Sequence, residues 1–349
     1  MMVLQEIINN YRATGELSHE EIVFLLGLEK PDEVGGLLAL ANEVREKHLG
    51  PDVHLRGIIE FSNHCVRRCV YCGLCYGNRE LKRYRMHPYE ILDTAAGAVE
   101  MGFRTIVLQS GEDFHYTNDM IACLVAAVKK MGAAVTLSLG DRPQAAYTSW
   151  KAAGADRYLL KFETSDTLLY RQLHPESTLA RRLKNLTYLR DLGYQLGSGN
   201  MVGLPGQTIT SLANDILLMK ELSLDMAGIG PFLPHPATPL GKARAGTMEM
   251  TLKVLAVTRL LLPRTHLPAT TALGSVQEDG RRAGLLAGAN VLMLNLTPVK
   301  YRALYDIYPA KAEATSKPQQ LKEEAEKLVD ELGRRVSSGY GHAVKIEYQ

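Results

Sequence analysis

Eight short runs rich in apolar and β-branched residues recur along the chain, and stretches with helical spacing separate them. The predicted strands are 54–63, 105–111, 134–140, 157–164, 194–202, 226–232, 267–272 and 290–296. The predicted helices between them include 88–101, 116–131, 178–191, 208–222 and 249–262. Near-continuous apolar strands that alternate with helices are typical of a parallel sheet covered by helices. The alternation therefore predicts an α/β fold, a (β/α)8 TIM-type barrel, with a shorter open barrel of six units as the alternative.

The segments outside this alternation are predicted to be helical. Residues 2–49 show amphipathic spacing that ends at Gly50 and Pro51. Residues 317–336 are rich in Lys and Glu and are predicted to form a solvated helix. We therefore expect a helical extension over 1–50, a barrel over 51–315, and a C-terminal helix and tail over 316–349 that packs on the barrel.

Composition limits the classes of function. The net charge of +2 suggests neither a nucleic acid nor an anionic membrane as partner. No apolar run is long enough to span a bilayer, and the first residues lack the pattern of a signal peptide. Five cysteines, three of them clustered, favour a reducing compartment and a metal site over disulfides. We expect a cytoplasmic protein.

The clustered cysteines are Cys65, Cys69 and Cys72, directly after the first predicted strand. Three thiolates with this spacing on one loop can hold three irons of a 4Fe–4S cluster and leave the fourth iron open to a small molecule. The spacing Cys-x3-Cys-x2-Cys, with an aromatic residue before the last cysteine, resembles the signature of radical S-adenosylmethionine (SAM) enzymes. A structural zinc site with His64 or Cys75 as fourth ligand is the alternative, and we expect Cys75 to be a free thiol near the cluster instead.

Polar residues follow several of the predicted strands, where a barrel places its chemistry. The SAM ammonium needs acceptors, for which the segment Ser110, Gly111, Glu112 and Asp113 is the candidate. The ribose hydroxyls need a carboxylate, predicted to be Glu163, and the methionine carboxylate needs a guanidinium, predicted to be Arg182. The adenine is expected near Met201 and the side of Tyr71.

Longer motifs resemble those of HydE, a radical SAM family of FeFe-hydrogenase maturases. They include residues 58–63, 81–86, 106–113, 135–140, 154–160, 201–208, 228–236 and 268–271, and the resemblance runs from about residue 2 to about 310. The family implies a (β/α)8 barrel of the radical SAM class, one SAM-binding 4Fe–4S cluster and a long internal cavity.

The resemblance also implies a substrate and partners. In HydE the SAM-derived radical attacks the sulfur of a small cysteine-bound Fe(CO)2(CN) precursor, which the maturase HydG delivers and whose product feeds assembly on HydF. A one-electron reductant is required. Matching positions place Ser138 with the cofactor, and they assign to the substrate the residues Arg56, Gln109, Thr136, Arg157, Met226, Thr270, Thr271 and Tyr305.

The chain departs from the HydE pattern at Lys161 and Phe162, where the family often has Arg and His before the ribose-binding Glu. This departure would suit a HydE paralogue with another small substrate. A methylornithine synthase-like lysine mutase shares the barrel and the cysteine loop, and a non-catalytic cluster carrier is the non-enzymatic alternative. Such a carrier would not need Glu163 and Arg182.

Overall fold

The computed structural model describes residues 3–309 and 316–343. The predicted end of the barrel at residue 315 and the last six residues of the predicted tail lie outside the described residues. Among the described residues, no helix combines the length and the apolar character that crossing a bilayer requires.

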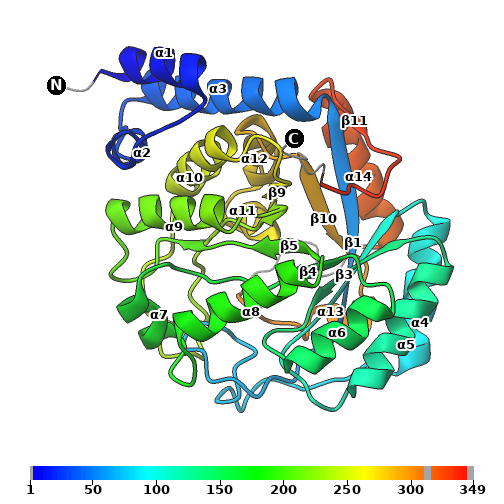
Figure 1. The fold of residues 1–349 in the computed structure, drawn as a ribbon. Coiled ribbons are helices and arrows are strands. Elements are labelled where there is room, and N and C mark those ends of the chain that lie inside the picture. Colours follow the sequence, from blue (N-terminus) through cyan, green and yellow to red (C-terminus); the bar gives the residue numbers. More distant parts are fainter. Residues whose placement is uncertain (1–2, 310–315, 344–349) are drawn as a thin grey trace.

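Eight parallel strands form the barrel, as predicted from the apolar runs (Figure 1). Their order around the sheet is β7-β5-β4-β3-β2-β1-β10-β9. The strands are β1 (Asp52–Ser62), β2 (Thr105–Ser110), β3 (Ala134–Ser138), β4 (Arg157–Leu159), β5 (Gln195–Ser198), β7 (Met226–Ala227), β9 (Pro268–Ala269) and β10 (Val291–Asn295). A parallel bridge between Met226 and His266 joins the two ends of the sheet, so the barrel is nearly closed.

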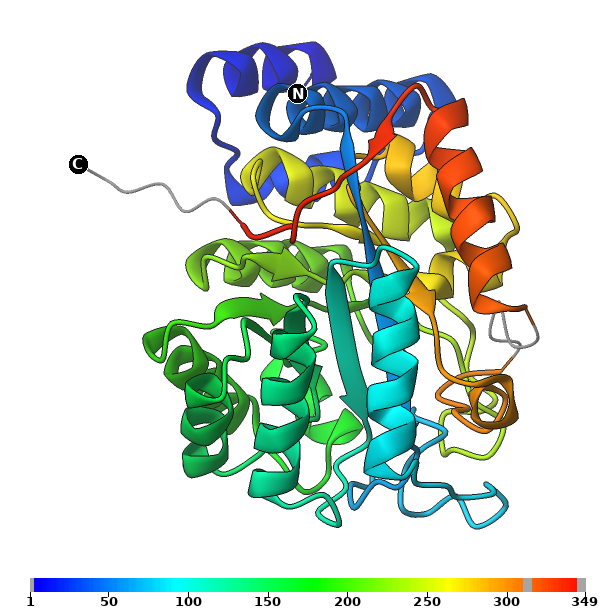
Figure 2. The ribbon, with the colours of Figure 1, turned by 90° about the vertical axis from the view of Figure 1, so that its right-hand side faces the viewer.

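Helices cover the outside of the barrel (Figures 1 and 2). Those close to the predicted ranges are α4 (Pro88–Glu100), α5 (Asn118–Lys130), α8 (Leu179–Asp191), α9 (Ile209–Glu221) and α10 (Met248–Leu261). Further helices are α6 (Gln144–Ala152), α7 (Thr167–Leu173), α11 (Thr271–Val276), α12 (Gly280–Leu286) and α13 (Val299–Arg302). Side-chain oxygens cap α5, α8, α9 and α10, where Thr117, Thr178, Thr208 and Thr247 accept a backbone N–H of the first turn.

The N-terminal segment forms three helices, α1 (Leu4–Thr14), α2 (His19–Leu26) and α3 (Pro31–Leu49). They pack on α9, α10 and α12 at the amino end of the barrel. The Tyr11 hydroxyl donates to the Leu260 carbonyl at 2.9 Å, and the Lys253 ammonium donates to the Leu28 carbonyl at 2.7 Å. The cysteine loop lies at the opposite end, where β1 ends (Figure 1).

The C-terminal segment also packs on the barrel. Helix α14 (Pro318–Glu331) buries Leu321, Ala325 and Val329 on one face, so it is solvated on its other face only. Strand β11 (Arg335–Val336) then pairs in parallel with the start of β1. Residues 340–343 continue across the amino end of the barrel, where they contact Arg157 and Gln195.

Two predicted strands are interrupted in the structure. The run 194–202 divides into β5 and β6 (Met201–Val202), and the run 226–232 divides into β7 and β8 (Gly230–Pro231), which pairs with β6. Regular pairing of β4 stops at Leu159, before the predicted end at 164. Regular pairing with the barrel therefore stops before the predicted end of each of these strands, and residues of the segments that follow, such as Glu163, Met201 and Pro231, line an internal cavity.

Candidate active site: a cysteine loop above a barrel cavity

The cysteine loop connects β1 to α4 and carries Cys65, Cys69 and Cys72, all partly exposed. The end of β2 closely approaches it. A Cβ atom on Gly111 would lie 2.3 Å from the His64 carbonyl oxygen and 2.8 Å from the Cys65 Cβ. Glycine at 111 is therefore what lets the loop pack down on the barrel. Three soft thiol donors on one tightly packed loop fit the ligand set of an iron–sulfur cluster.

The guanidinium of Arg83 holds the far part of this loop. It donates to the carbonyls of Asn63 at 2.5 Å, Leu74 at 2.9 Å and Cys75 at 2.8 Å. These carbonyls lie at both ends of the cysteine segment, so one side chain fixes the loop where it leaves β1 and where it returns. The Cys75 side chain is buried beside this contact.

Burial raises the pKa of the Cys65, Cys69 and Cys72 thiols. The pKa of Cys72 is raised to about 12, mainly because its side chain is desolvated and secondarily because Cys65 lies nearby. Burial also raises the pKa of Cys69 well above its usual value, and the charges of Cys72 and Cys65 raise it further. Burial thus favours the protonated thiols, and a bound iron would supply positive charge that favours the thiolates.

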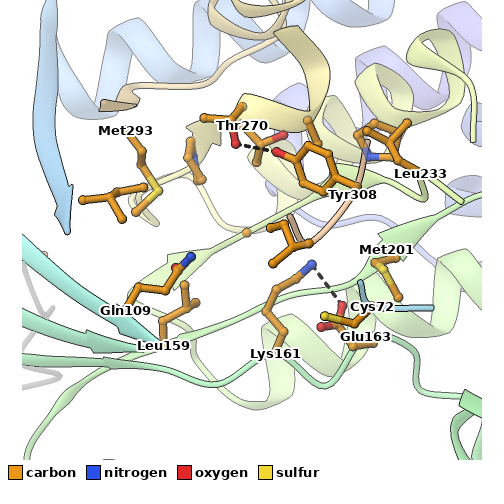
Figure 3. A pocket seen from close by; sticks show the side chains of 18 of the residues that line it. Cys72, Gln109, Leu159, Lys161, Glu163, Met201, Leu233, Thr270, Met293 and Tyr308 are labelled. Carbon is orange, nitrogen blue, oxygen red and sulfur yellow. Dashed lines mark hydrogen bonds and ion pairs between the residues drawn. The ribbon is translucent and has the colours of Figure 1, made fainter. Parts of the chain in front are cut away.

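A cavity of about 340 Å³ lies inside the barrel directly below the cysteine loop (Figure 3). Cys72 and Tyr71 line the end of the cavity next to the cysteine loop, which we call its upper end although Figure 3 draws Cys72 near the bottom. Residues from β1, β2, β4, β9 and β10 line the walls. The predicted site residues among its lining are Arg56, Tyr71, Cys72, Gln109, Glu163, Met201, Met226, Thr270 and Thr271. The fold thus brings together the cysteine loop, three residues predicted for SAM and five predicted for the substrate.

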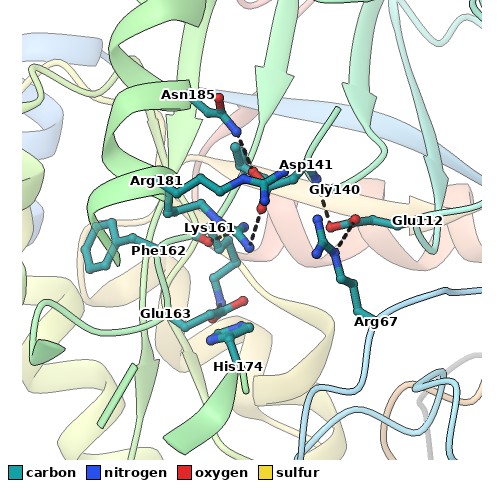
Figure 4. Close-up of polar contacts among 12 residues, drawn as sticks. Arg67, Glu112, Gly140, Asp141, Lys161, Phe162, Glu163, His174, Arg181 and Asn185 are labelled. Carbon is teal, nitrogen blue, oxygen red and sulfur yellow. Dashed lines mark hydrogen bonds and ion pairs between the residues drawn. The ribbon is translucent and has the colours of Figure 1, made fainter. Parts of the chain in front are cut away.

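Glu163 lies at the upper end of the cavity in a network of polar side chains (Figure 4). The Lys161 ammonium lies 3.0 Å from one of its carboxylate oxygens, and the Tyr71 hydroxyl donates to the other at 3.5 Å. The Tyr71 hydroxyl also lies 3.1 Å from His174 Nε2. Glu163 has a φ of 66°, a left-handed conformation that costs a residue with a Cβ about 1 kcal/mol. Such a conformation is held by its surroundings and is common at functional sites.

Arg182 reaches the loop from α8 and lines a small cleft beside Cys69 and Glu112. Its guanidinium donates to the Lys161 carbonyl at 2.9 Å and pairs with Asp141 at 3.1 Å. Both side chains of the pair are almost fully buried, and the charge of Asp141 raises the pKa of Arg182 against the effect of burial. The arginine is thus charged and held beside the cysteines.

The segment predicted to accept the SAM ammonium is already engaged in ion pairs. Glu112 pairs with Arg67 at 2.5 Å, and Asp113 receives two hydrogen bonds from Arg85, at 2.7 and 3.0 Å. The Ser110 hydroxyl donates to the Gly111 carbonyl at 2.7 Å. The carbonyls of Gly111, Glu112 and Asp113 also each accept a hydrogen bond within the fold. The two carboxylates of this segment therefore act on the cysteine loop.

We call the part of the cavity across from Cys72 and Glu163 its lower end, which Figure 3 draws toward the top. It is lined by Thr270, Thr271, Tyr308, Met226 and Arg56. The Thr271 and Tyr308 hydroxyls lie 2.8 Å apart, while the buried Thr270 hydroxyl has no hydrogen-bond partner among the described residues (Figure 3). The fully buried Arg56 guanidinium contacts the Met226 sulfur and donates to the Gly341 carbonyl at 3.3 Å, and its Nε has no hydrogen-bond partner within residues 3–309 and 316–343. This end of the cavity therefore offers unsatisfied donors and a buried positive charge.

The other predicted site residues lie outside the cavity lining. Thr136 is buried within β3, and its hydroxyl has no hydrogen-bond partner in the part of the chain that the structure describes. Tyr305 is buried and interacts with Gln109. Arg157, at the start of β4, donates to the carbonyls of Tyr340 at 2.7 Å and Gly341 at 2.9 Å. Ser138 lies at the end of β3, also outside the lining.

Sequence reasoning missed several residues of the site. The sequence singles out Lys161 only as a departure from the HydE pattern, yet Lys161 lines the cavity together with Glu60, Tyr308 and Asn295. Its position two residues before Glu163 was a signal, because alternate residues of an extended segment face the same side. By the same alternation Phe162 faces away from the cavity and is fully buried in the hydrophobic core. The aromatic substitution therefore lies in the core, and Lys161 supplies a cation inside the cavity.

Comparisons with known proteins match this architecture. Residues 59–219 match the family model of the radical SAM superfamily. The chain is 50% identical over 310 residues, 89% of each protein, to the [FeFe] hydrogenase maturase subunit HydE of Thermotoga maritima. It is 31% identical to the 3-methylornithine synthase of Methanosarcina acetivorans, over 79% of each protein.

Solved structures agree. The structure of methylornithine synthase (PylB) superposes with a TM-score of 0.84 at 27% identity, covering 96% of this chain and 97% of that one. The structure of the maturase HydG superposes with a TM-score of 0.81 at 19% identity, covering 96% of this chain and 76% of that one, which shows a shared fold. The cysteine loop, the barrel cavity and 50% identity over 89% of its length to the HydE subunit of Thermotoga maritima together show that this chain belongs to the HydE family of radical SAM enzymes.

Proposed function

We propose that this protein is a HydE-type hydrogenase maturase that binds a 4Fe–4S cluster and SAM and acts on a small cysteine-bound Fe(CO)2(CN) precursor. The observation that carries the proposal is the single cavity that joins the cysteine loop to a buried, donor-rich lower end. When bound, the cluster supplies one electron that cleaves SAM and generates an adenosyl radical.

The residues at the upper end of the cavity fit SAM. Cys65, Cys69 and Cys72 would hold three irons, leaving the fourth for the methionine part of SAM. Arg182, charged and buried beside Cys69, suits its carboxylate. Glu163, held between Lys161 and Tyr71, suits the ribose hydroxyls.

The residues at the lower end fit a compact anionic substrate. Arg56 places a positive charge there, and no carboxylate is among its hydrogen-bond partners within the described residues. The Thr270 hydroxyl supplies an unsatisfied donor. The lower end thus suits a ligand with a net negative charge and small acceptor groups. In this proposal a HydG-type maturase delivers the substrate and a HydF-type scaffold accepts the product.

One observation favours a second candidate, a methylornithine synthase-like lysine mutase. Glu60 lines the cavity and is buried, and it accepts a hydrogen bond from Asn295 at 2.8 Å. An inward acid is what the ammonium group of an amino acid needs. The 31% identity to 3-methylornithine synthase is consistent with this candidate.

The test is to reconstitute the protein with iron and sulfide, reduce it in the presence of SAM, and offer the iron–cysteine precursor or L-lysine. Adenosine attached to the sulfur of the precursor supports the maturase. Formation of methylornithine supports the mutase. Cleavage of SAM without modification of either compound would support a radical SAM enzyme and exclude both proposed substrates.

A further inference from the structure

The cysteine loop is strongly basic, and the proposed chemistry at its inner side does not use this charge. Residues 63–87 contain six Lys and Arg side chains and a single acid, Glu80, although the whole chain has a net charge of only +2. The six cations are Arg67, Arg68, Arg79, Lys82, Arg83 and Arg85. Three of them, Arg67, Arg83 and Arg85, are engaged within the fold as described above, so the remaining three need another explanation.

Arg68, Arg79 and Lys82 are exposed on the outer side of the loop. Arg68 forms a long ion pair with Glu176, at 3.4 Å, in which both side chains are largely exposed. Among the described residues, no hydrogen bond or ion pair engages the side chain of Arg79 or of Lys82. Exposed ion pairs of this kind contribute little to stability, so the fold does not account for the charges.

Apolar side chains lie among these cations. Residues Val66 and Tyr76 are each 45% exposed. The guanidinium groups of Arg68 and Arg79 both lie over the Tyr76 ring, each 5.2 Å from its centroid. The Tyr76 N–H donates to the Arg67 carbonyl at 2.7 Å, which fixes this residue against the cysteine segment. We call Val66, Arg68, Tyr76 and Arg79 the cluster-loop face.

The cluster-loop face is the outer side of the loop whose inner side closes the cavity. Arg68 is the neighbour of Cys69, and the two line the same small cleft. The cavity below Cys72 is where SAM and the substrate would lie, so an electron donor has to approach the cysteines from the outer side. Surfaces with an exposed aromatic residue and arginines at the centre are typical of protein interfaces.

We propose that the cluster-loop face is the docking surface for a small acidic protein that carries single electrons. The inference rests on the proposed function, because it requires a cluster at Cys65, Cys69 and Cys72. The exposed cations would steer a negatively charged partner, and Tyr76 and Val66 would form the apolar centre of a small, transient interface. In each encounter the carrier is oxidised by one electron and the cluster is reduced by one, and no bond forms or breaks at the face.

Rapid mixing with a reduced flavodoxin of strongly negative net charge tests this inference. The rate at which flavodoxin reduces the reconstituted cluster is divided by the dithionite-driven rate of the same variant, which removes effects on the cluster itself. We expect Arg79→Glu to lower this ratio by about tenfold or more at low ionic strength, and added salt to lower it in the wild type. Arg12→Glu is the matched control, because Arg12 is exposed on α1 at the opposite end of the barrel.

A second readout needs no cluster. The cluster-free protein should bind oxidised flavodoxin with a salt-dependent affinity that Arg79→Glu weakens and Arg12→Glu does not. If Arg79→Glu matches Arg12→Glu in both measurements, the docking surface is refuted. If dithionite itself does not support SAM cleavage in the wild type, the proposed function fails instead, so the two failures can be told apart.

Discussion

The buried ion pair between Arg182 and Asp141 allows a quantitative prediction for Arg182→Met. The guanidinium lies 3.1 Å from the Asp141 carboxylate, and the two side chains are 10% and 1% exposed. The substitution removes the positive charge and leaves the carboxylate buried. It also removes the hydrogen bond to the Lys161 carbonyl, which is 2.9 Å long.

Removal of one partner of a buried ion pair usually costs about 3 to 5 kcal/mol of stability. Asn185 still donates to Asp141 at 2.9 Å, which stabilises the remaining carboxylate in part. We therefore expect the lower end of that range, about 3 kcal/mol. The double variant Asp141→Asn with Arg182→Met no longer buries a charge, so it should regain about 2 kcal/mol of the loss.

Urea unfolding of the cluster-free protein measures these differences. Arg181→Met is the matched control, because Arg181 is the exposed neighbour of Arg182 on the same helix, and it should stay within about 0.5 kcal/mol of the wild type. In SAM-binding measurements, Arg182→Met should bind SAM more weakly than the control. A loss of less than about 1 kcal/mol, or a double variant no more stable than Arg182→Met, would refute the reasoning.

Three further predictions concern the surroundings of the cysteine loop. Burial lowers the pKa of His174 to about 4 from its usual 6.5, so the stability that the neutral imidazole contributes is present above pH 6.5 and is lost as the pH falls toward 4, by about 3 kcal/mol. Urea unfolding at several pH values should therefore show that His174→Gln loses less stability than the wild type when the pH falls from 6.5 to 4. An equal loss in the two proteins would contradict the lowered pKa of His174. Arg83→Met removes the hydrogen bonds to carbonyls at both ends of the loop, so the reconstituted Arg83→Met variant should hold less iron than the reconstituted Arg83→Lys variant. Equal iron contents in the two variants would show that Arg83 does not position the loop. In Gly73→Ala the new Cβ would lie 2.0 Å from the Asp306 carbonyl oxygen, so the cysteine loop must shift and the iron content of the reconstituted protein should fall. An iron content equal to that of the wild type would show that the contact relaxes without disturbing the cysteines.

The barrel was predictable because its strands are apolar on both faces, and residues such as Ile106, Val107 and Leu108 admit few other structures. The break in β4 was not predictable. It depends on the left-handed backbone of Glu163, which contacts with Gly199 and Met201 maintain. Helix α6 was missed because Gln144–Ala152 is short and has few large apolar residues.

The site was predictable where residues with metal-binding side chains lie at a characteristic spacing in the sequence, as Cys65, Cys69 and Cys72 do. It was not predictable where distant segments meet. Arg157 was expected in the cavity, but residues 340–343 fold back across the barrel and engage its guanidinium, and nothing in the local sequence indicates that contact. By contrast, the positions of Lys161 and Glu163, two residues apart in an extended segment, did indicate that the two side chains lie on the same side of it.

The most direct test of the central claim is the electron paramagnetic resonance spectrum of the reduced, reconstituted protein with and without SAM. An iron without a protein ligand predicts that SAM shifts the spectrum, and that Cys69→Ala abolishes both the cluster signal and 5′-deoxyadenosine formation. A fully loaded cluster whose spectrum SAM leaves unchanged would contradict the account.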